Sequence, residues 1–124
     1  MGIFDGLMGN ASQVDAKEIE KEFQELLAQG ESVDRAYKLI RDLIVFTNKR
    51  LIFVDKQGVT GKKMDYHSIP YRSISHFSIE TAGHFDLDAE MKIWISSSTT
   101  PIQKTFNNKL NIYEVQRVLA SYVM

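Results

Sequence analysis

The sequence predicts a mainly β domain, α+β by overall content, with about seven antiparallel strands between an N-terminal and a C-terminal helix. Two apolar tetrads around a short polar break, at 43–54, predict a central hairpin. A long alternation of apolar and polar residues at 86–96 predicts a further strand, and helical apolar stripes lie at 15–29 and 111–122. The chain has 124 residues, of which 44% are hydrophobic, and this suffices for one core.

The central hairpin lies between Leu43 and Val54. Its arms, Leu43–Phe46 and Leu51–Val54, are rich in β-branched and aromatic residues and too short for helices. Asn48 in the polar break tolerates the left-handed backbone that such turns often need. Because successive side chains point to opposite faces, both faces of both arms are apolar. One face fills the domain core, and the other must be covered by a terminal helix or by another copy of the chain.

The N-terminal segment is expected to be largely helical. Within residues 1–10 the apolar side chains share one face of a helix, which favours either a frayed end or a short plug that docks on a neighbour or a membrane. Asp15–Gln29 is the clearer helix, because Asp15 and Glu18 form an N-cap pair and Gly30 is a natural stop. Its apolar stripe is long enough to cover the second face of the hairpin and consists of Ile19, Phe23, Leu26 and Leu27.

The remaining strands are bounded by turn residues. Beside the hairpin, strands are predicted at Val33–Ile40, Lys62–Ile69, Ser75–Thr81, Asp86–Ser96 and Pro101–Phe106. Pro70 begins a connector, because proline cannot donate to a ladder. Asn111 caps a C-terminal helix that is expected to cover an open end of the sheet. The apolar stripe of that helix consists of Ile112, Val115, Val118, Leu119 and Tyr122.

The strand at 86–96 has a polar face with one anomaly, Trp94. A large aromatic residue on a polar face is often an interface or binding anchor, and otherwise it packs under a loop or a terminal helix. Glu80 on the neighbouring strand is expected to lie near the carboxylates of this face. Like charges repel there unless Lys or Arg side chains, from this chain or a neighbouring subunit, lie opposite. The candidate binding residues of this face are Glu80, His84, Asp86, Asp88, Glu90 and Trp94.

Composition and motifs exclude several classes of function. The net charge of −1 gives no basic field for nucleic acid, and the absence of cysteine removes disulfides and thiol catalysis. The turn at 58–63 lacks the glycine spacing of a phosphate loop, and the three histidines fall in different elements without ligand spacing. No apolar run is long enough to span a membrane, and no secretory signal is recognised. The sequence therefore predicts a cytoplasmic protein with no cofactor, no metal and no catalytic site.

Four stretches of the sequence resemble the bacterial pleckstrin-homology (PH) domain family of the short, single-domain type. They are Asp42–Leu51, Asp55–Lys63, Ile69–Ile74 and Glu80–Glu90, and the match extends from about Glu31 to the C-terminus. The resemblance implies a PH-like fold, an open and strongly bent barrel capped by the C-terminal helix. It divides the chain into an N-terminal helical extension, residues 1–30, and a PH-like domain, residues 31–124.

The resemblance also implies a non-enzymatic interaction module. Short members of the family assemble into cyclic homo-oligomers, which implies a pentameric ring for this chain. Such a ring presents a polar surface between adjacent protomers, and this surface is expected to bind an unidentified protein partner. The polar strand face that carries Trp94 is expected to contribute to it.

The alternative is a peripheral membrane adaptor that binds anionic lipid headgroups. Eukaryotic PH domains often hold phosphoinositides with a basic motif in the first strand–loop–strand. Here Asp34 and Asp42 interrupt the basic residues of that part of the chain. The residues that would meet lipid phosphates are Lys49, Arg50, Lys62, Lys63 and Arg72, aided by Ile3 and Phe4.

Overall fold

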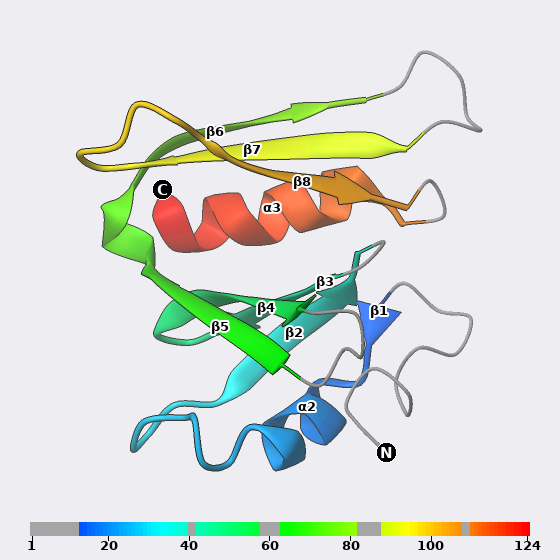
Figure 1. The fold of residues 1–124 in the computed structure, drawn as a ribbon, viewed down its shortest axis with the longest axis vertical. Helices are drawn as coiled ribbons and strands as arrows, with labels where there is room; N and C mark the ends of the chain where they lie inside the picture. The colour runs from blue at the N-terminus through cyan, green and yellow to red at the C-terminus, as the bar shows by residue number, and fades with distance from the viewer. Residues whose placement is uncertain (1–12, 40–41, 58–62, 82–87, 108–109) are drawn as a thin grey trace. The chain divides into compact units, whose positions relative to one another are not determined.

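A computed structural model describes residues 13–39, 42–57, 63–81, 88–107 and 110–124 (Figure 1). The chain forms two compact units, Met1–Ser68 and Ile69–Met124. The first unit contains β1 (Gln13–Val14), α2 (Ala16–Glu22), β2 (Val33–Lys38), β3 (Asp42–Thr47), β4 (Arg50–Gln57) and most of β5 (Lys63–Pro70). The second contains the 3₁₀ helix η1 (Tyr71–Ser73), β6 (Ile74–Glu80), β7 (Ala89–Ile95), β8 (Ile102–Phe106) and α3 (Ile112–Val123). The predicted division after residue 30 stays a prediction.

The first unit is built on a sheet with the strand order β1-β2-β3-β4-β5. Its centre is the predicted hairpin, in which β3 and β4 pair antiparallel with Leu43 opposite Val54 and Phe46 opposite Leu51. Because β3 ends at Thr47 and β4 begins at Arg50, the connection consists of Asn48 and Lys49, the middle two residues of the polar tetrad. The long β-branched and aromatic arms form strands because such side chains pack well on a pleated surface.

Asn48 tolerates a left-handed backbone, but the turn does not use that conformation at this residue. Among the non-glycine residues of the described part, Ser97 alone has a positive φ. Asn48 instead stabilises the turn with its side chain: its Oδ1 accepts a hydrogen bond from the Ser32 N–H at 2.8 Å, and its Nδ2 donates to the Gly30 carbonyl at 3.0 Å. Gly30 itself takes the left-handed conformation, with φ +77°.

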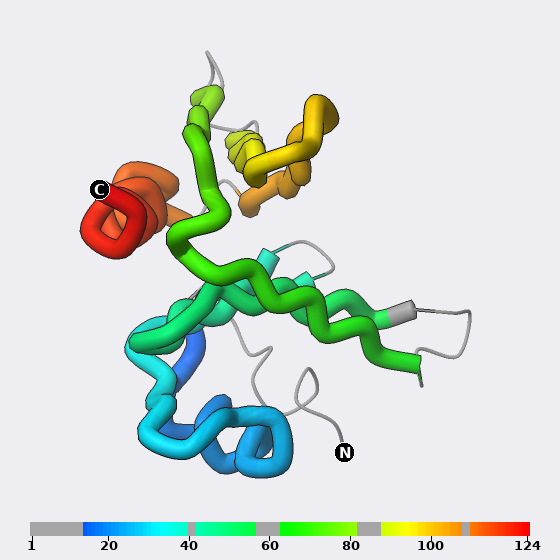
Figure 2. The backbone as a smooth tube through the Cα atoms, turned by 90° about the vertical axis from the view of Figure 1, so that its left-hand side faces the viewer, coloured from blue at the N-terminus to red at the C-terminus, as the bar shows by residue number. Residues whose placement is uncertain are grey.

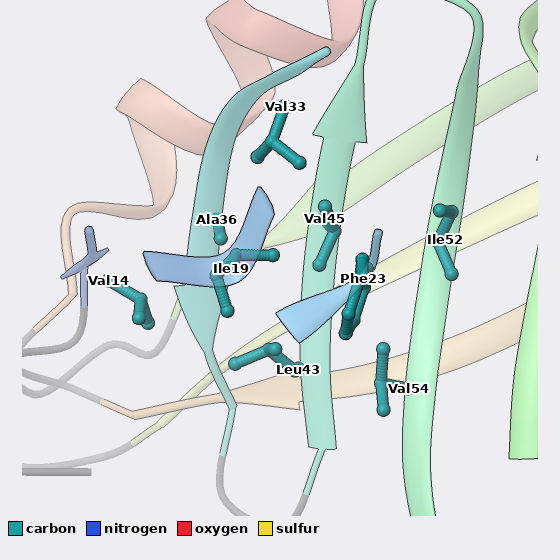
Figure 3. Packing of buried hydrophobic residues seen from close by; sticks show 9 residues of the cluster. All are labelled: Val14, Ile19, Phe23, Val33, Ala36, Leu43, Val45, Ile52 and Val54. Carbon is teal, nitrogen blue, oxygen red and sulfur yellow. The ribbon is translucent and has the colours of Figure 1, made fainter. Parts of the chain in front are cut away.

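One face of the central hairpin packs against α2 and the turns that follow it (Figure 3). Ile19 and Phe23 of this segment are at most 3% exposed and reach the sheet, and Leu26 and Leu27 pack at the margin. Each large apolar side chain buried in this way contributes about 1.5–3 kcal/mol. The predicted stripe thus covers the hairpin. The core cluster consists of Val14, Ile19, Phe23, Val33, Ala36, Leu43, Val45, Ile52 and Val54.

The helix that carries this stripe is shorter than predicted, because α2 ends at Glu22 rather than at Gln29. Its start agrees with the sequence, since the Asp15 side chain accepts a hydrogen bond from the Lys17 N–H. After Glu22 the backbone groups are used elsewhere: the Leu26 carbonyl accepts from a side chain of β4, and the Ala28 N–H donates to a glutamate. The first of these hydrogen bonds is long-range and the second is local, and both use backbone groups that the ladder of a longer helix would need.

The other face of the hairpin is also buried within the single chain. Ile44, Phe46 and Leu51 have no exposed surface, and Phe53 is 2% exposed. Within the first unit, the ring of Tyr37 meets that of Phe46 edge to face, with centroids 6.1 Å apart.

The second unit is a three-stranded antiparallel sheet of order β6-β7-β8 with α3 beside it (Figures 1 and 2). The Asn111 side chain caps α3 by accepting a hydrogen bond from the Tyr113 N–H at 3.0 Å. α3 contacts β6 and η1, and at its far end Tyr122 stacks on Tyr71 with centroids 4.4 Å apart. The buried stripe of α3 agrees with the prediction and consists of Ile112, Val115, Val118 and Leu119.

Candidate binding face of the three-stranded sheet

On one face of the three-stranded sheet of the second unit, polar and aromatic side chains lie in rows across the strands. We call this face the polar face. The strand register places Trp94 opposite His76, Lys92 between Ser78 and Gln103, and Glu90 between Glu80 and Thr105. Directly opposed residues of paired strands point to the same face. The members of the polar face are therefore His76, Ser78, Glu80, Glu90, Lys92, Trp94, Gln103 and Thr105.

Buried residues on the opposite side of this sheet fix the orientation of the polar face. Met91 and Ile93, which alternate with Glu90, Lys92 and Trp94 along β7, are each 1% exposed. Strict alternation along a half-buried strand forces the intervening side chains outward. The polar face is thus fixed by the burial of its neighbours, as the period-2 pattern predicts.

Trp94 forms an aromatic pair with His76 across β6 and β7. The two rings stack with centroids 4.4 Å apart and planes inclined by 15°. The hydroxyl of Ser75 donates to the Trp94 carbonyl at 3.1 Å and lies 3.3 Å from His76 Nδ1, which joins the same strands beside the pair. Trp94 is half-buried, whereas His76 is exposed. The anomalous tryptophan of the sequence therefore packs on a histidine of the polar face.

His76 is the aromatic member that the predicted binding residues did not include, although alternation places it on the same side of its strand as Glu80. The signal was available in the predicted hairpin. Counting outward from the turn between β6 and β7, a register that places Glu80 opposite Glu90 also places His76 opposite Trp94, four residues further along each strand. Alternation assigns both side chains to the polar side.

The acidic row lies where the sequence predicts it, and the expected Lys or Arg side chains from a neighbouring subunit stay a prediction. Glu80 lies opposite Glu90, as predicted. The Glu90 carboxylate accepts a hydrogen bond from the Gln103 amide, so this partner of the carboxylate is a neutral group. Within the described ranges, no ion pair joins Glu80 or Lys92 to another side chain. Asp88 is exposed just before β7.

Two of the predicted binding residues, His84 and Asp86, lie outside the described residues. The same holds for Lys62 of the lipid-binding alternative. Of the other basic residues of that alternative, Lys49, Lys63 and Arg72 are exposed.

Arg50 is held inside the first unit by its own hydrogen bonds. Its Nε and Nη2 donate to the two carboxylate oxygens of Glu31 at 2.9 and 3.0 Å. Nη1 donates to Ser68 Oγ, and Nη2 also donates to the Leu26 carbonyl, each at 2.8 Å. These four hydrogen bonds use four of the five N–H donors of the guanidinium and leave one, on Nη1, for any other ligand. This arrangement argues against Arg50 as a lipid ligand.

Glu31 is the buried centre of this arrangement, and its side chain has no exposed surface. Besides Arg50, its carboxylate accepts hydrogen bonds from the Thr47 hydroxyl at 2.6 Å and from the Ala28 N–H at 2.8 Å. We call Glu31, Arg50, Thr47 and Ala28 the Glu31 network. Burial acts to raise the pKa of Glu31, but the hydrogen bonds from Arg50 and Thr47 more than offset it and lower the pKa from 4.5 to about 2. No local pattern in the sequence predicts this charge pair.

Two further observations concern the described part of the chain alone. None of its His, Asp and Glu side chains gather in groups of three or more that could hold a metal ion. None of its helices is long and apolar enough to cross a membrane.

The chain is similar to known proteins over nearly its whole length. The family described as bacterial PH domain matches residues 2–123. The uncharacterized protein YjqA of Bacillus subtilis (strain 168) is 56% identical over 125 residues, covering 100% of both chains. A pleckstrin-homology domain protein of Shewanella loihica PV-4 is 46% identical with a TM-score of 0.83, covering 94% of this chain and 99% of its own. A pleckstrin-homology domain of Shewanella amazonensis SB2B is 50% identical with a TM-score of 0.83, covering 99% of each chain.

Proposed function

Because the chain belongs to the bacterial PH domain family and has its mainly β fold, we propose that it is a non-enzymatic module that binds a protein partner through the polar face. The single observation that carries this proposal is the stacked pair of Trp94 and the exposed His76. A preformed aromatic pair within a polar surface has the composition of an interface anchor with a polar rim.

The surroundings of this pair favour a protein ligand. Tryptophan is enriched among residues that dominate binding energy, and the stack with His76 holds its ring in one orientation before binding. Ser78, Gln103 and Thr105 are exposed and offer donors and acceptors around it. A rigid aromatic centre with adaptable polar neighbours suits a peptide or protein surface.

The proposal includes self-assembly into a cyclic homo-oligomer, a pentameric ring, which rests on the family resemblance. The burial of both hairpin faces in one chain means that contacts between copies would use exposed residues instead. Size-exclusion chromatography with light scattering tests this part. We expect a discrete mass about five times the 14.2 kDa of one chain. A monomer at all concentrations would contradict the ring and leave partner binding by a single domain.

Partner binding is tested by photo-cross-linking in the native cells of the protein. A photoreactive amino acid at position 78 samples the centre of the polar face, and the same group at Ser121, which is exposed on α3, is the matched control. We expect a cross-linked protein from position 78 that disappears when Trp94→Ala is added and far-UV circular dichroism stays native. If the two positions capture the same proteins, or Trp94→Ala has no effect, the polar face is not the binding site.

A peripheral membrane adaptor remains the second candidate, based on the exposed Lys49, Lys63 and Arg72. The engagement of Arg50 with Glu31 removes one charge from this set. Flotation with vesicles containing phosphatidylserine tests it: salt-sensitive binding that is lost in Lys49→Glu would favour the adaptor. Absence of flotation at low salt would reject it.

A further inference from the structure

The edge strand β6 offers a place where the partner can be bound by its backbone. β6 pairs with β7 on one side, and no described strand pairs with its other side (Figure 1). An edge strand carries unpaired N–H and C=O groups that can accept one more strand. Peptide recognition often uses such strand addition, with side-chain contacts supplying specificity.

The apolar side of the sheet is less well covered at β6 than at its neighbour. Phe77 and Ile79 are half-buried, whereas the residues opposite them on β7, Ile93 and Met91, are each 1% exposed. A strand added beside β6 would bring its own side chains next to Phe77 and Ile79. Burial of the remaining apolar surface of these two residues would favour the addition.

On the polar side, two rows of side chains end at β6, and each ends in a group that a further strand could contact. The aromatic row ends at His76, and a flat side chain placed opposite it would extend the stack with Trp94. The acidic row ends at Glu80, which lies opposite Glu90; Lys92 is in the next row of the same face, but among the described residues no ion pair joins it to Glu80. A lysine or arginine placed opposite Glu80 would neutralise like charges that otherwise repel.

We propose that the partner contributes an extended segment that pairs with the outer edge of β6. This inference rests on the proposed function and specifies its ligand. Opposite Glu80 the segment carries Lys or Arg, and opposite His76 it carries Arg or an aromatic residue. These two positions are four residues apart, because His76 and Glu80 are four apart on one face of the strand. Apolar residues lie between them, against Phe77 and Ile79.

A second copy of the chain is the competing occupant. In an antiparallel pair of β6 strands centred on Ser78, His76 would face Glu80 of the partner subunit. An imidazole is a weaker counter-charge for two carboxylates than a permanently charged guanidinium or a lysine ammonium. The acidic row therefore favours a basic segment from another protein.

The inference is tested with an eleven-residue synthetic peptide whose centre reads Lys-Val-Thr-Val-Arg. Trp94 is the single tryptophan of the chain, so its fluorescence reports binding beside His76 directly. We expect Glu80→Gln to weaken binding about threefold and Glu80→Lys about tenfold. A peptide with Glu in place of Lys is expected to bind Glu80→Lys more tightly than the unaltered protein, which makes the charge contact reciprocal. Asp65→Lys, the same charge change at an exposed residue of β5, is the control and is expected to change nothing.

Strand addition itself is tested with two methylated versions of the same peptide. Each carries N-methyl groups on the alternate backbone nitrogens of one edge of the peptide strand. Methylation of the edge that faces β6 removes the donors of the ladder while all side chains remain, so we expect binding to be lost for one of the two methylated peptides. Hydrogen exchange of the β6 amides is expected to slow when the unmethylated peptide is bound.

Several outcomes would overturn the inference. Three concern the peptide: full binding of both methylated versions, binding that Glu80→Lys does not change, and no change in Trp94 fluorescence at millimolar peptide. The fourth is a doubled mass of the protein in solution that Glu80→Lys abolishes, which would identify a second copy as the occupant. Cross-linking from position 78 to a native protein is independent of each of these outcomes and tests the proposed function. If cross-linking succeeds and the peptide tests fail, the proposed function stands without strand addition. If cross-linking fails, the proposed function itself is wrong.

Discussion

Glu31→Gln is expected to destabilise the protein strongly at neutral pH and much less in acid. The folded state lowers the pKa of Glu31 from 4.5 to about 2, because the hydrogen bonds from Arg50 and Thr47 stabilise the charged form against the cost of burial. A depressed pKa stabilises the folded protein above the unfolded value, and this contribution is lost as the pH falls from about 4.5 to about 2.

The magnitude follows from the size of the shift. At 1.36 kcal/mol for each pKa unit, the ionised Glu31 contributes about 3 kcal/mol at pH 7 relative to its protonated form. By the same linkage about 1.5 kcal/mol remains at pH 3. Glutamine resembles the protonated side chain, so the gap in unfolding free energy between the two proteins is expected to halve over this range. A domain is stable by about 5–15 kcal/mol, so the effect at pH 7 is large enough to measure.

The assay is urea unfolding followed by far-UV circular dichroism at pH 7, 5 and 3. Glu25→Gln is the control, because Glu25 is exposed in the same segment and its change is expected to stay within about 0.5 kcal/mol. Other carboxylates titrate alike in both proteins and cancel in the difference. A gap that is the same at pH 7 and pH 3, or equal for Glu25→Gln, would refute the assignment of the low pKa to the Glu31 network.

Three further changes test separate features. Ile52→Ala is expected to cost about 2–5 kcal/mol in urea unfolding, because Ile52 has no exposed surface and its removal leaves a cavity against Phe23; a cost below 1 kcal/mol would contradict this packing. Gly30→Ala is expected to cost about 1–2 kcal/mol through backbone strain alone, since φ is +77° and a Cβ would meet nothing within 4 Å; Gly30→Asn, which tolerates this φ, is expected to cost less. His76→Ala is expected to change the fluorescence of Trp94 while the free energy of unfolding in urea changes by no more than about 0.5 kcal/mol, and unchanged fluorescence would argue against the stack in solution.

The strands of the fold were largely predictable because their patterns are local. The alternation at β7 and the doubly apolar arms of β3 and β4 depend on residues that are neighbours in sequence, and the structure has both. The end of α2 was not predictable in this way. The Leu26 carbonyl is bound by the side chain of Arg50, 24 positions away, and the Ala28 N–H by the side chain of Glu31, and neither hydrogen bond leaves a periodic signal.

The candidate site shows the same division. Trp94 was identified as an anomaly because one strand pattern suffices to place it on a polar face. Its contact with His76 needed the exact pairing of two strands across a turn, which the sequence constrains only through the opposition of Glu80 and Glu90. The Glu31 network was missed because a buried glutamate is recognised by its partners. The two side chains that bind Glu31, Thr47 and Arg50, lie 16 and 19 positions away in the sequence.

The Glu31 network also bears on the order in which the chain folds. Its members, and the groups of Leu26 and Ser68 that Arg50 also binds, all belong to the first unit, so no residue beyond Ser68 is needed to complete these hydrogen bonds. During synthesis these groups leave the ribosome before the second unit exists. We expect the first unit to gain native contacts early, as a platform on which folding continues, because its contacts close short loops. Thr47→Val would then slow folding more than it speeds unfolding in stopped-flow experiments, and the reverse partition would place the network late in folding.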